Sequence, residues 1–249
     1  MDLNISGKTA IICAASHGLG NACATALANE GVNVVINGRT RETLEAAAET
    51  IRRTATNVAV NTVVGNVTDT KCREQMLDAA GGKPDILVNN AGGPPPGDFR
   101  DWDRDVWLSA LDTNMLSAIE LVRIVIDGMA ERGFGRIVNI TSSAVRFPIP
   151  VIGLSNATRA GLTNFLFGLV PEFSSKGVTI NNLLPGPFDT NRLRNSKEIT
   201  RHLTTNAVAG RVGDPAELGA LCAFLCSAHS GYITGQNFLI DGGLYNGSF

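Results

Sequence analysis

The amino-terminal part of the chain contains the sequence Lys8-Thr-Ala-Ile-Ile-Cys-Ala-Ala-Ser-His-Gly-Leu-Gly20. Thr9 to Cys13 is a short apolar run with β-branched residues, which predicts a buried strand. Gly18 and Gly20 follow at once, and residues 21–29 then alternate small and apolar residues at helical spacing. A strand, a glycine turn and a helix begin a βαβ unit that binds a nucleotide, because the glycines let backbone approach the phosphates and the helix supplies free N–H groups.

The spacing of this turn is Ala14-x-x-x-Gly18-x-Gly20, which differs from the G-x-G-x-x-G fingerprint of dinucleotide-binding proteins. A turn that only packs a helix on a strand uses the same residues, so this alternative stays open for the stretch alone. We expect a bound nucleotide to contact Ala14, Ser16, His17, Gly18, Leu19 and Gly20. The methyl group of Ala14 is tolerated if its φ is negative, although it narrows the approach.

Length and composition favour one dinucleotide-binding domain over residues 1–249, since 44% of the residues are hydrophobic and no linker divides the chain. The net charge of −2, with acids and bases mixed, argues against nucleic acid and an anionic membrane surface as partners. The five cysteines form no C-x-x-C pair and lie in apolar stretches, which indicates buried thiols and no metal site. With no signal segment and no run of membrane length, we expect a cytoplasmic protein.

Strand and helix patterns alternate along the chain. Strands are predicted at Thr9–Cys13, Val32–Asn37, Val58–Val64, Ile86–Asn89, Gly135–Ile140, Val178–Leu184 and Asn237–Ile240, and helices near Gly18–Asn29, Arg41–Thr54, Thr70–Ala80, Arg104–Arg132, Ser155–Ser175 and Pro215–Ala228. This order predicts a doubly wound, Rossmann-type α/β fold with a parallel sheet of about seven strands, covered by helices on both faces. The ligand then binds at the carboxyl ends of the strands. Pro171 should kink its helix or end the regular bonding.

Two predicted helices, Trp107–Met129 and Ala160–Phe173, are apolar on more than one face. One face can pack on the sheet, and we expect the other to contact another copy of the chain, giving a homo-oligomer, a tetramer. A thick local core is the alternative.

The second predicted strand is followed by Gly38-Arg39-Thr40. An NAD site usually has an acid here, about 20 residues after the glycine turn, that holds the ribose 2′-hydroxyl. Arg39 is placed instead to bind a 2′-phosphate, with Arg41 nearby and His17 as a further donor. Because a guanidinium matches the geometry of a phosphate, this pattern favours NADP(H). Otherwise Arg39 is a surface loop charge.

Further motifs occur in a consistent order. They are Asn89-Asn90-Ala91-Gly92, Asp112-Thr-Asn114-Met, Gly135-Arg-Ile-Val-Asn-Ile-Thr-Ser142, Asn181-Asn-Leu-Leu-Pro185-Gly186-Pro-Phe-Asp-Thr190, and Tyr232-Ile-Thr-Gly235 with Asp241-Gly242-Gly243. With these motifs the chain resembles the short-chain dehydrogenase/reductase family nearly from end to end. In length and in its last motif it is similar to ketoreductases of the 3-oxoacyl type. The resemblance implies an oxidoreductase that transfers hydride to a small-molecule carbonyl substrate.

The resemblance also implies roles for single residues. Ser142 matches the active-site serine, and Asn114 matches the asparagine in the middle of a helix. Asn66 stands near the adenine, where the family usually has an aspartate. The residues expected to border the cofactor are Asn66, Val67, Asn90, Ala91, Gly92, Arg159, Pro185, Gly186 and Thr190, of which Thr190 reaches the phosphates.

The chain departs from the family at the proton donor. From Ser142, the family pattern places a tyrosine at position 155 and a lysine at position 159, and this chain has Ser155 and Arg159. Only two tyrosines exist, of which Tyr232 belongs to the last strand motif. Tyr245 is expected to be an interface contact, and the alternative is that it reaches an active site, its own or a neighbour's.

This exchange changes the chemistry. A phenol has a pKa of about 10 that neighbours can lower, whereas a serine hydroxyl is a far weaker acid. Arg159 lies one helical turn from Ser155 and can hold the ribose, but it stays charged and delivers no proton. Three interpretations follow: a reductase that protonates its product through water or the ribose hydroxyl, a reductase with another donor, or a catalytically silent NADP(H)-binding sensor or partner subunit.

Three segments are expected to bind the substrate: residues 93–98, 145–154 and 188–207. The first two are rich in proline and apolar residues, and the third carries Arg192, Arg194, Lys197, Arg201 and His202. An apolar wall with a cationic lid would suit a hydrophobic substrate that bears an anion. A solvated helix in a lid is the simpler interpretation.

Overall fold

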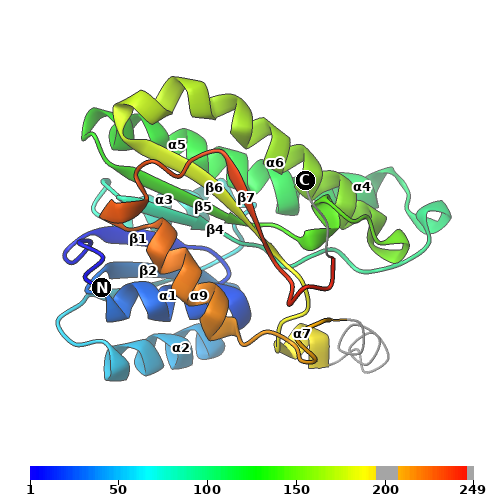
Figure 1. Ribbon diagram of the computed structural model, residues 1–249, viewed down its shortest axis with the longest axis horizontal. Helices are drawn as coiled ribbons and strands as arrows, with labels where there is room; N and C mark the ends of the chain where they lie inside the picture. Colours follow the sequence, from blue (N-terminus) through cyan, green and yellow to red (C-terminus); the bar gives the residue numbers. More distant parts are fainter. Residues whose placement is uncertain (195–206, 246–249) are drawn as a thin grey trace.

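The computed structural model describes residues 1–194 and 207–245 (Figure 1). The strands are β1 Thr9–Ile12, β2 Asn33–Gly38, β3 Val60–Val64, β4 Ile86–Asn89, β5 Gly135–Ile140, β6 Val178–Pro185 and β7 Gln236–Ile240. The α-helices are α1 Gly18–Asn29, α2 Arg41–Thr54, α3 Thr70–Ala79, α4 Arg104–Leu111, α5 Ser117–Glu131, α6 Gly153–Phe173, α7 Asn191–Arg194 and α9 Pro215–Leu225. Many of the predicted ends coincide with these bounds, and the others differ by one to three residues.

The strands form one parallel sheet in the order β3-β2-β1-β4-β5-β6-β7. The predicted doubly wound, seven-stranded fold is therefore confirmed. A parallel sheet is covered on both faces, which explains why every residue of β5 is buried. Strand order reverses between β1 and β4, and in open α/β sheets a crevice forms at this point, outside the carboxyl ends.

Helices cover the two faces of the sheet as separate layers. Figure 1 shows α1, α2 and α9 on one face and α3, α4, α5 and α6 on the other. Each layer has its own apolar core, one built on Leu27, Leu44 and Leu218 and the other on Leu121 and Leu166. The loops after the strands, together with α7, lie at the carboxyl edge and form the site described below.

The predicted helix over 104–132 is not one regular helix. It consists of α4, a π-helical turn at Asp112–Leu116 and α5. A π turn widens the helix locally, and such turns occur frequently at functional sites. In α6, Pro171 removes one N–H donor, and the helix ends at Phe173, where the Ser174 hydroxyl donates to the Val170 carbonyl oxygen at 2.7 Å.

All five cysteines are free and buried, as predicted. Burial raises the pKa of Cys13 to about 12, so this thiol stays protonated. Within residues 1–194 and 207–245, no set of three or more His, Cys, Asp or Glu side chains is arranged to bind a metal ion. No helix in the same ranges has the length and apolar content that a bilayer span requires.

Candidate active site

The glycine turn after β1 is shaped for close approach. Gly18 has a φ of +64°, and the methyl carbon of Thr190 lies 3.5 Å from the place where a Cβ on Gly18 would stand. A Cβ on Gly20 would stand 2.6 Å from the Ala14 carbonyl oxygen, so only glycine fits there. His17 is exposed at the start of α1 and makes no side-chain cap, so the first N–H groups of α1 face the turn uncapped.

Ala14 adopts a left-handed conformation with a φ of +47°. The negative φ under which a methyl group at this position would be tolerated without strain is therefore not the one the chain adopts. Two hydrogen bonds hold the backbone here: the carbonyl oxygen of Ala14 accepts from Asn90 Nδ2 at 3.3 Å, and Ala15 N donates to Asn37 O at 2.8 Å. An L-residue in this region costs roughly 1–2 kcal/mol.

Replacing Ala14 with glycine should therefore stabilise the protein. Glycine removes the strain energy of the left-handed conformation, and this gain is larger than the entropic cost of a more flexible unfolded chain. We expect Tm to rise by about 2–4 °C, equivalent to about 1 kcal/mol. Differential scanning calorimetry measures the shift. Ala15→Gly is the matched control, because Ala15 is buried and has no positive φ, so its replacement should lower Tm. A lower Tm for both variants would contradict strain at Ala14.

The turn after β2 lies beside the glycine turn. The Ser16 side chain packs against the Cα of Gly38, and Arg39 follows as an exposed residue. Arg41 lines an open hollow of about 300 Å³ with Thr62, Val63, Val64 and Gln75, at the ends of β2 and β3. Asn66 is exposed and accepts a hydrogen bond from Thr68 N at 3.3 Å, whereas Val67 is buried.

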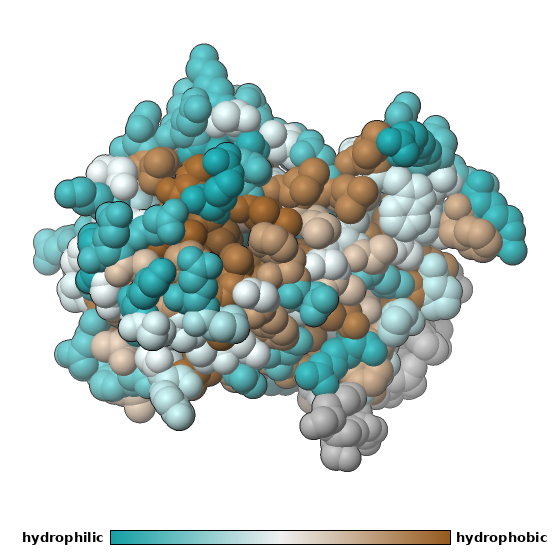
Figure 2. Space-filling view, turned by 90° about the horizontal axis from the view of Figure 1, so that it is seen from above, coloured by the Kyte–Doolittle hydropathy of each residue, from teal (hydrophilic) through white to brown (hydrophobic). Residues whose placement is uncertain are grey.

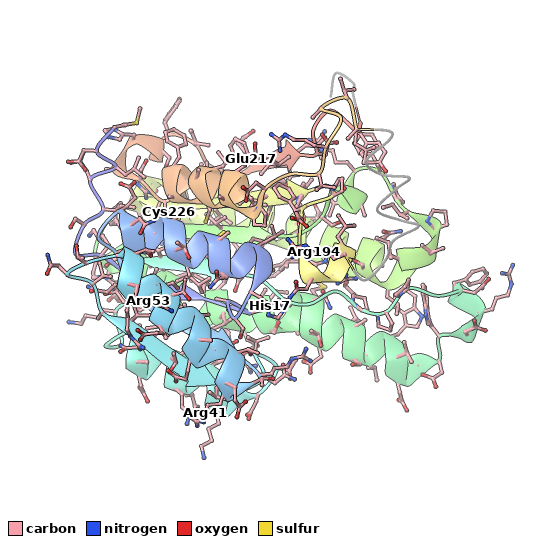
Figure 3. The ribbon with its side chains drawn as sticks, turned by 90° about the horizontal axis from the view of Figure 1, so that it is seen from below. His17, Arg41, Arg53, Arg194, Glu217 and Cys226 are labelled. Atoms are coloured by element: carbon pink, nitrogen blue, oxygen red, sulfur yellow. The ribbon has the colours of Figure 1, made fainter. Side chains whose placement is uncertain are left out.

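The Pro185-Gly186 loop closes the other side. Gly186 N donates to Ile240 O at 2.8 Å, and a Cβ on Gly186 would stand 2.6 Å from the Asp241 Cβ. The loop continues to Thr190, which contacts Gly18, and to α7. Figure 3 shows Arg194 of α7 beside the start of α1, where His17 lies. The predicted cofactor residues thus come together at the carboxyl ends of β1, β2, β3, β4 and β6, and their contact with a cofactor stays a prediction.

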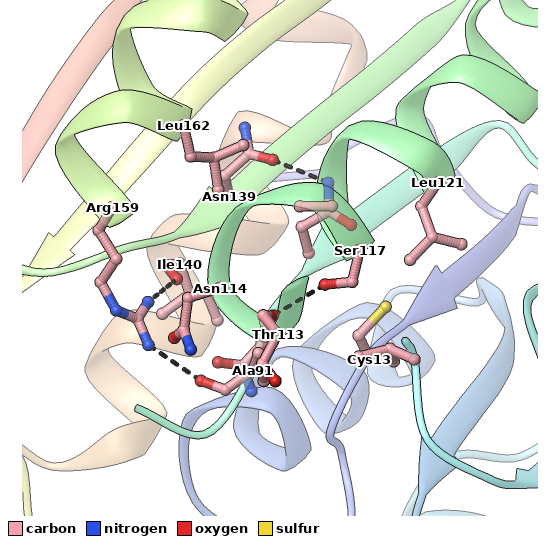
Figure 4. A pocket seen from close by; sticks show the side chains of 14 residues that line it. Cys13, Ala91, Thr113, Asn114, Ser117, Leu121, Asn139, Ile140, Arg159 and Leu162 are labelled. Carbon is pink, nitrogen blue, oxygen red and sulfur yellow. Dashed lines mark hydrogen bonds between the residues drawn. The ribbon is translucent and has the colours of Figure 1, made fainter. Parts of the chain in front are cut away.

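Arg159 ties α6 to the ends of two strands (Figure 4). Its Nη1 donates to the carbonyl oxygens of Ile140 and Thr141 at 2.9 and 3.0 Å, and Nη2 donates to that of Ala91 at 3.0 Å. The side chain is buried, and this burial, together with the charge of Arg192, lowers its pKa to about 10. Arg159 is therefore still a cation at neutral pH, and most of its donors are already used within the protein.

Ser155 contacts this guanidinium, and Ser142 directly follows Thr141, whose carbonyl oxygen the guanidinium bonds. Arg159 Nε donates to Ser155 Oγ at 3.2 Å, because the two residues are one helical turn apart. Ser142 follows Thr141, and its Oγ accepts from Ala144 N at 3.1 Å. Both hydroxyls accept a bond and keep their own hydrogen for a ligand. The cation behind Ser155 polarises that hydroxyl and strengthens it as a donor.

A row of asparagines crosses the sheet beside this site, and the sequence analysis missed it. Asn89 Nδ2 donates to Asn139 Oδ1 at 2.9 Å, Asn139 Nδ2 to Asn182 Oδ1 at 3.1 Å, and Asn182 Nδ2 to Asn237 Oδ1 at 3.0 Å. The four residues are in register on β4, β5, β6 and β7. An asparagine in each of these strand motifs was the signal that could have revealed the row.

A cavity of about 20 Å³ lies where the row meets Arg159 and Asn114 (Figure 4). Asn89 Oδ1 and Asn114 Oδ1 are buried there and accept no hydrogen bond from the described residues. The cavity is large enough for one water molecule, which would satisfy both oxygens. Asn114 belongs to the π turn, so the irregular helix presents this amide to the same pocket as Arg159.

Tyr245 has a partner within its own chain. Its ring stacks on Phe147, with centroids 4.0 Å apart and planes inclined by 7°. Phe147 belongs to the segment after Ser142, so the tail lies along an expected substrate segment. The third expected substrate segment, residues 188–207, is described only in part. Its cations Arg192 and Arg194 are described, whereas Lys197, Arg201 and His202 lie outside the described residues.

Comparison with known proteins gives long matches. A family profile described as Enoyl-(Acyl carrier protein) reductase matches residues 13–245. The 3-oxoacyl-[acyl-carrier-protein] reductase FabG of Vibrio cholerae is 32% identical over 98% of this chain and 99% of its own length. Dehydrogenase/reductase SDR family member 4 of Bos taurus is 31% identical over 96% and 88%. The structure of L-sorbose reductase from Gluconobacter frateurii, complexed with NADPH and L-sorbose, covers 100% of both chains with a TM-score of 0.92 and 28% identity.

Proposed function

The chain belongs to the short-chain dehydrogenase/reductase family of oxidoreductases, and from this premise we propose that it is an NADP(H)-dependent reductase of small-molecule carbonyl compounds, similar to the 3-oxoacyl reductases. One observation carries the proposal: Thr190 and Asn90 both lie against the glycine turn before α1, whose first N–H groups are uncapped. Arg39 follows β2 at the same edge of the sheet. A relative of the same fold was solved with NADPH.

The residues fit the dinucleotide in three places. The uncapped start of α1 and Thr190 would hold the diphosphate, since free N–H groups and a hydroxyl suit phosphate oxygens. Exposed Arg39 would hold the 2′-phosphate, with Ser16 and Arg41 beside it. Arg159 Nη2 has a second N–H besides the one that it donates to Ala91 O, and this donor would face the nicotinamide ribose.

Arg39→Ala is expected to weaken NADPH binding by about 10- to 100-fold and to leave NADH binding nearly unchanged, because only NADPH carries the 2′-phosphate. Fluorescence titration with both nucleotides gives the two Kd values. Arg53→Ala is the matched control, because Arg53 is also exposed and lies at the far end of α2 from Arg41 (Figure 3). Equal losses for NADPH and NADH in Arg39→Ala would contradict the phosphate role.

When bound, NADPH supplies a hydride to the carbonyl carbon. Ser142 and Ser155 donate hydrogen bonds to the carbonyl oxygen as it gains negative charge, and the Arg159 cation stabilises that charge through Ser155. The serine hydroxyls are too weakly acidic to lose a proton outright. We infer that Ser155 would pass a proton to the product oxygen, and that water, or a ribose hydroxyl when the cofactor is bound, would supply it.

One observation favours a second function, a catalytically silent NADP(H)-binding sensor or partner subunit. Position 155 has no phenol, and Arg159 is bound to three carbonyl oxygens rather than free to move. Such a protein would keep cofactor affinity and lose the general acid, which contributes about 10²–10⁴ to the rate.

The test separates these functions. NADPH and NADH are titrated first, and NADPH oxidation is then followed with a panel of ketones, sugars with a keto group and 3-oxoacyl thioesters. Turnover of any member supports the reductase. Tight NADPH binding without turnover supports the silent function, and absence of binding to either nucleotide would refute both.

We also propose that the chain forms a homo-oligomer, with a tetramer as the expected state. Figure 2 shows apolar side chains gathered on the upper face, over α5 and α6 of Figure 1. Leu108, Leu116 and Phe165 are 47%, 47% and 42% exposed on α4, the π turn and α6. A contiguous apolar patch on a monomer favours association, and light scattering of the purified chain counts the copies.

A further inference from the structure

Arg192 of α7 spans the space between two loops of the site. Its Nη2 donates to the Pro94 carbonyl oxygen at 3.3 Å, in the segment that follows β4. Gly93 makes room for the guanidinium, since a Cβ there would stand 2.9 Å from Arg192 Cζ. Arg192 is nevertheless an exposed residue. Among the described residues, the Pro94 carbonyl oxygen is the one acceptor that this guanidinium bonds, and it uses one of five N–H donors.

A second guanidinium is attached to the same segment. Arg159 donates to Ala91 O, and Ala91 lies two residues before Gly93, which is at most about 7 Å along the backbone. Arg159 reaches this segment from α6, and Arg192 reaches it from α7. The two cations repel each other, and the charge of Arg192 contributes to the lowered pKa of Arg159.

The acids near this pair are engaged elsewhere. Asp189 forms two bonds of 2.7 Å with Arg194, and Asp98 forms two bonds of 3.1 Å with Arg100. Within the described ranges, no carboxylate forms an ion pair with Arg159 or Arg192. The two guanidinium groups that bond the segment after β4 repel each other, and an anion bound between them would offset that repulsion.

We propose that Arg192 is the specificity-determining residue of this site and binds an oxyanion of the substrate, so that the protein prefers keto acids to neutral ketones. Arg159 contributes charge to the same anion from its buried position. An arginine fork suits a carboxylate because two parallel N–H groups meet its two oxygens. The inference rests on the proposed reductase function. The diphosphate of the cofactor offers the same oxyanion chemistry, and the experiment distinguishes these two sources.

The test compares pyruvate, acetoacetate and levulinate, whose carboxylates lie at increasing distance from the keto group, with their methyl esters. For the wild-type protein we expect a higher kcat/KM for at least one acid than for its ester. Arg192→Gln should raise KM for that acid by about 10- to 100-fold and leave the ester unchanged. Arg192→Lys should recover part of the loss, since it keeps the charge without the fork. Arg123→Gln is the matched control and should preserve the acid preference, because Arg123 is also an exposed arginine but pairs with Glu120 on α5.

A binding measurement that needs no turnover tests the role of Arg192 independently of the proposed reductase activity. Calorimetric titration of the protein–NADP⁺ complex with the same keto acids should show binding that Arg192→Gln weakens, even if no substrate is reduced. Equal kcat/KM for acids and esters, or no binding of any keto acid, would overturn the proposal. A loss of NADPH affinity in Arg192→Gln, measured without substrate, would assign the arginine to the cofactor diphosphate and would also overturn it.

Discussion

The double variant Ser155→Tyr/Arg159→Lys is expected to reduce carbonyl substrates about 10²–10⁴ times faster than the wild-type protein. The gain comes from a phenol that can act as a general acid, where the serine hydroxyl cannot. Ser155 Oγ lies 3.2 Å from Arg159 Nε, so the side chains at these two positions face each other across one helical turn. A lysine at 159 would therefore stand beside the new phenol and lower its pKa.

The two changes should be strongly non-additive. Ser155→Tyr alone meets a guanidinium that three carbonyl oxygens hold in place, so the phenol is crowded and gains little. Arg159→Lys alone supplies no acid. Initial rates of NADPH oxidation at saturating cofactor measure the effect, and the double variant should show a new ionisation in its pH–rate profile.

Ser155→Phe/Arg159→Lys is the matched control, because it has the same ring without the hydroxyl. It should stay as slow as the wild-type protein. Equal rates for the tyrosine and phenylalanine variants would show that the phenol does not act as an acid. No gain with unchanged NADPH affinity would mean that the substrate pocket, rather than the missing donor, limits the reaction.

Arg159→Met is expected to lower the free energy of unfolding by about 3 kcal/mol, which corresponds to a Tm lower by about 6–12 °C. Methionine fills much of the volume but leaves the carbonyl oxygens of Ala91, Ile140 and Thr141 without their charged donor. Removal of a buried charge offsets part of this loss, because burial already disfavours the cation, as its lowered pKa indicates. Denaturant unfolding measures the difference.

Arg136→Met is the control for this variant. Arg136 is equally buried and donates to the carbonyl oxygens of Ser227, Gly135 and Gly177, but it lies at the amino end of β5, away from the site. We expect both variants to lose similar stability. Only Arg159→Met should also weaken NADPH binding at a temperature where both are folded, because it releases the Ala91 segment. Equal effects on NADPH affinity would contradict a role of Arg159 in the site.

The sheet could be predicted from the sequence because each strand is a short apolar run bounded by turn residues, a local property that tertiary contacts did not override. The π turn could not be predicted, because residues 104–132 keep a helical pattern throughout and one widened turn leaves that period nearly unchanged. The positive φ of Ala14 could not be predicted either, because the turn is bonded to residues far along the chain: Ala14 O accepts from Asn90 Nδ2, and Ala15 N donates to Asn37 O.

For the site, the residues at the strand ends could be named because parallel strands bring their carboxyl ends to one edge. The partners of those residues could not. Arg159 was expected to face a ribose, and the structure adds three carbonyl oxygens, at the end of β5 and in the loops after β5 and β4, that no local pattern encodes. The asparagine row needed the register of four strands, which follows from the folded sheet.

By itself, the sequence determined the order of strands and helices, the glycine turn after β1, the cation at the end of β2 and the absence of a tyrosine at position 155, because these depend on residues close together in the chain. The tertiary structure decided what the charged groups contact. Arg159 meets Ala91 across 68 positions, and Arg192 meets Pro94 across 98. Such contacts depend on helix placement and strand register, which the whole core sets together, and they determine whether an arginine binds cofactor, substrate or its own backbone.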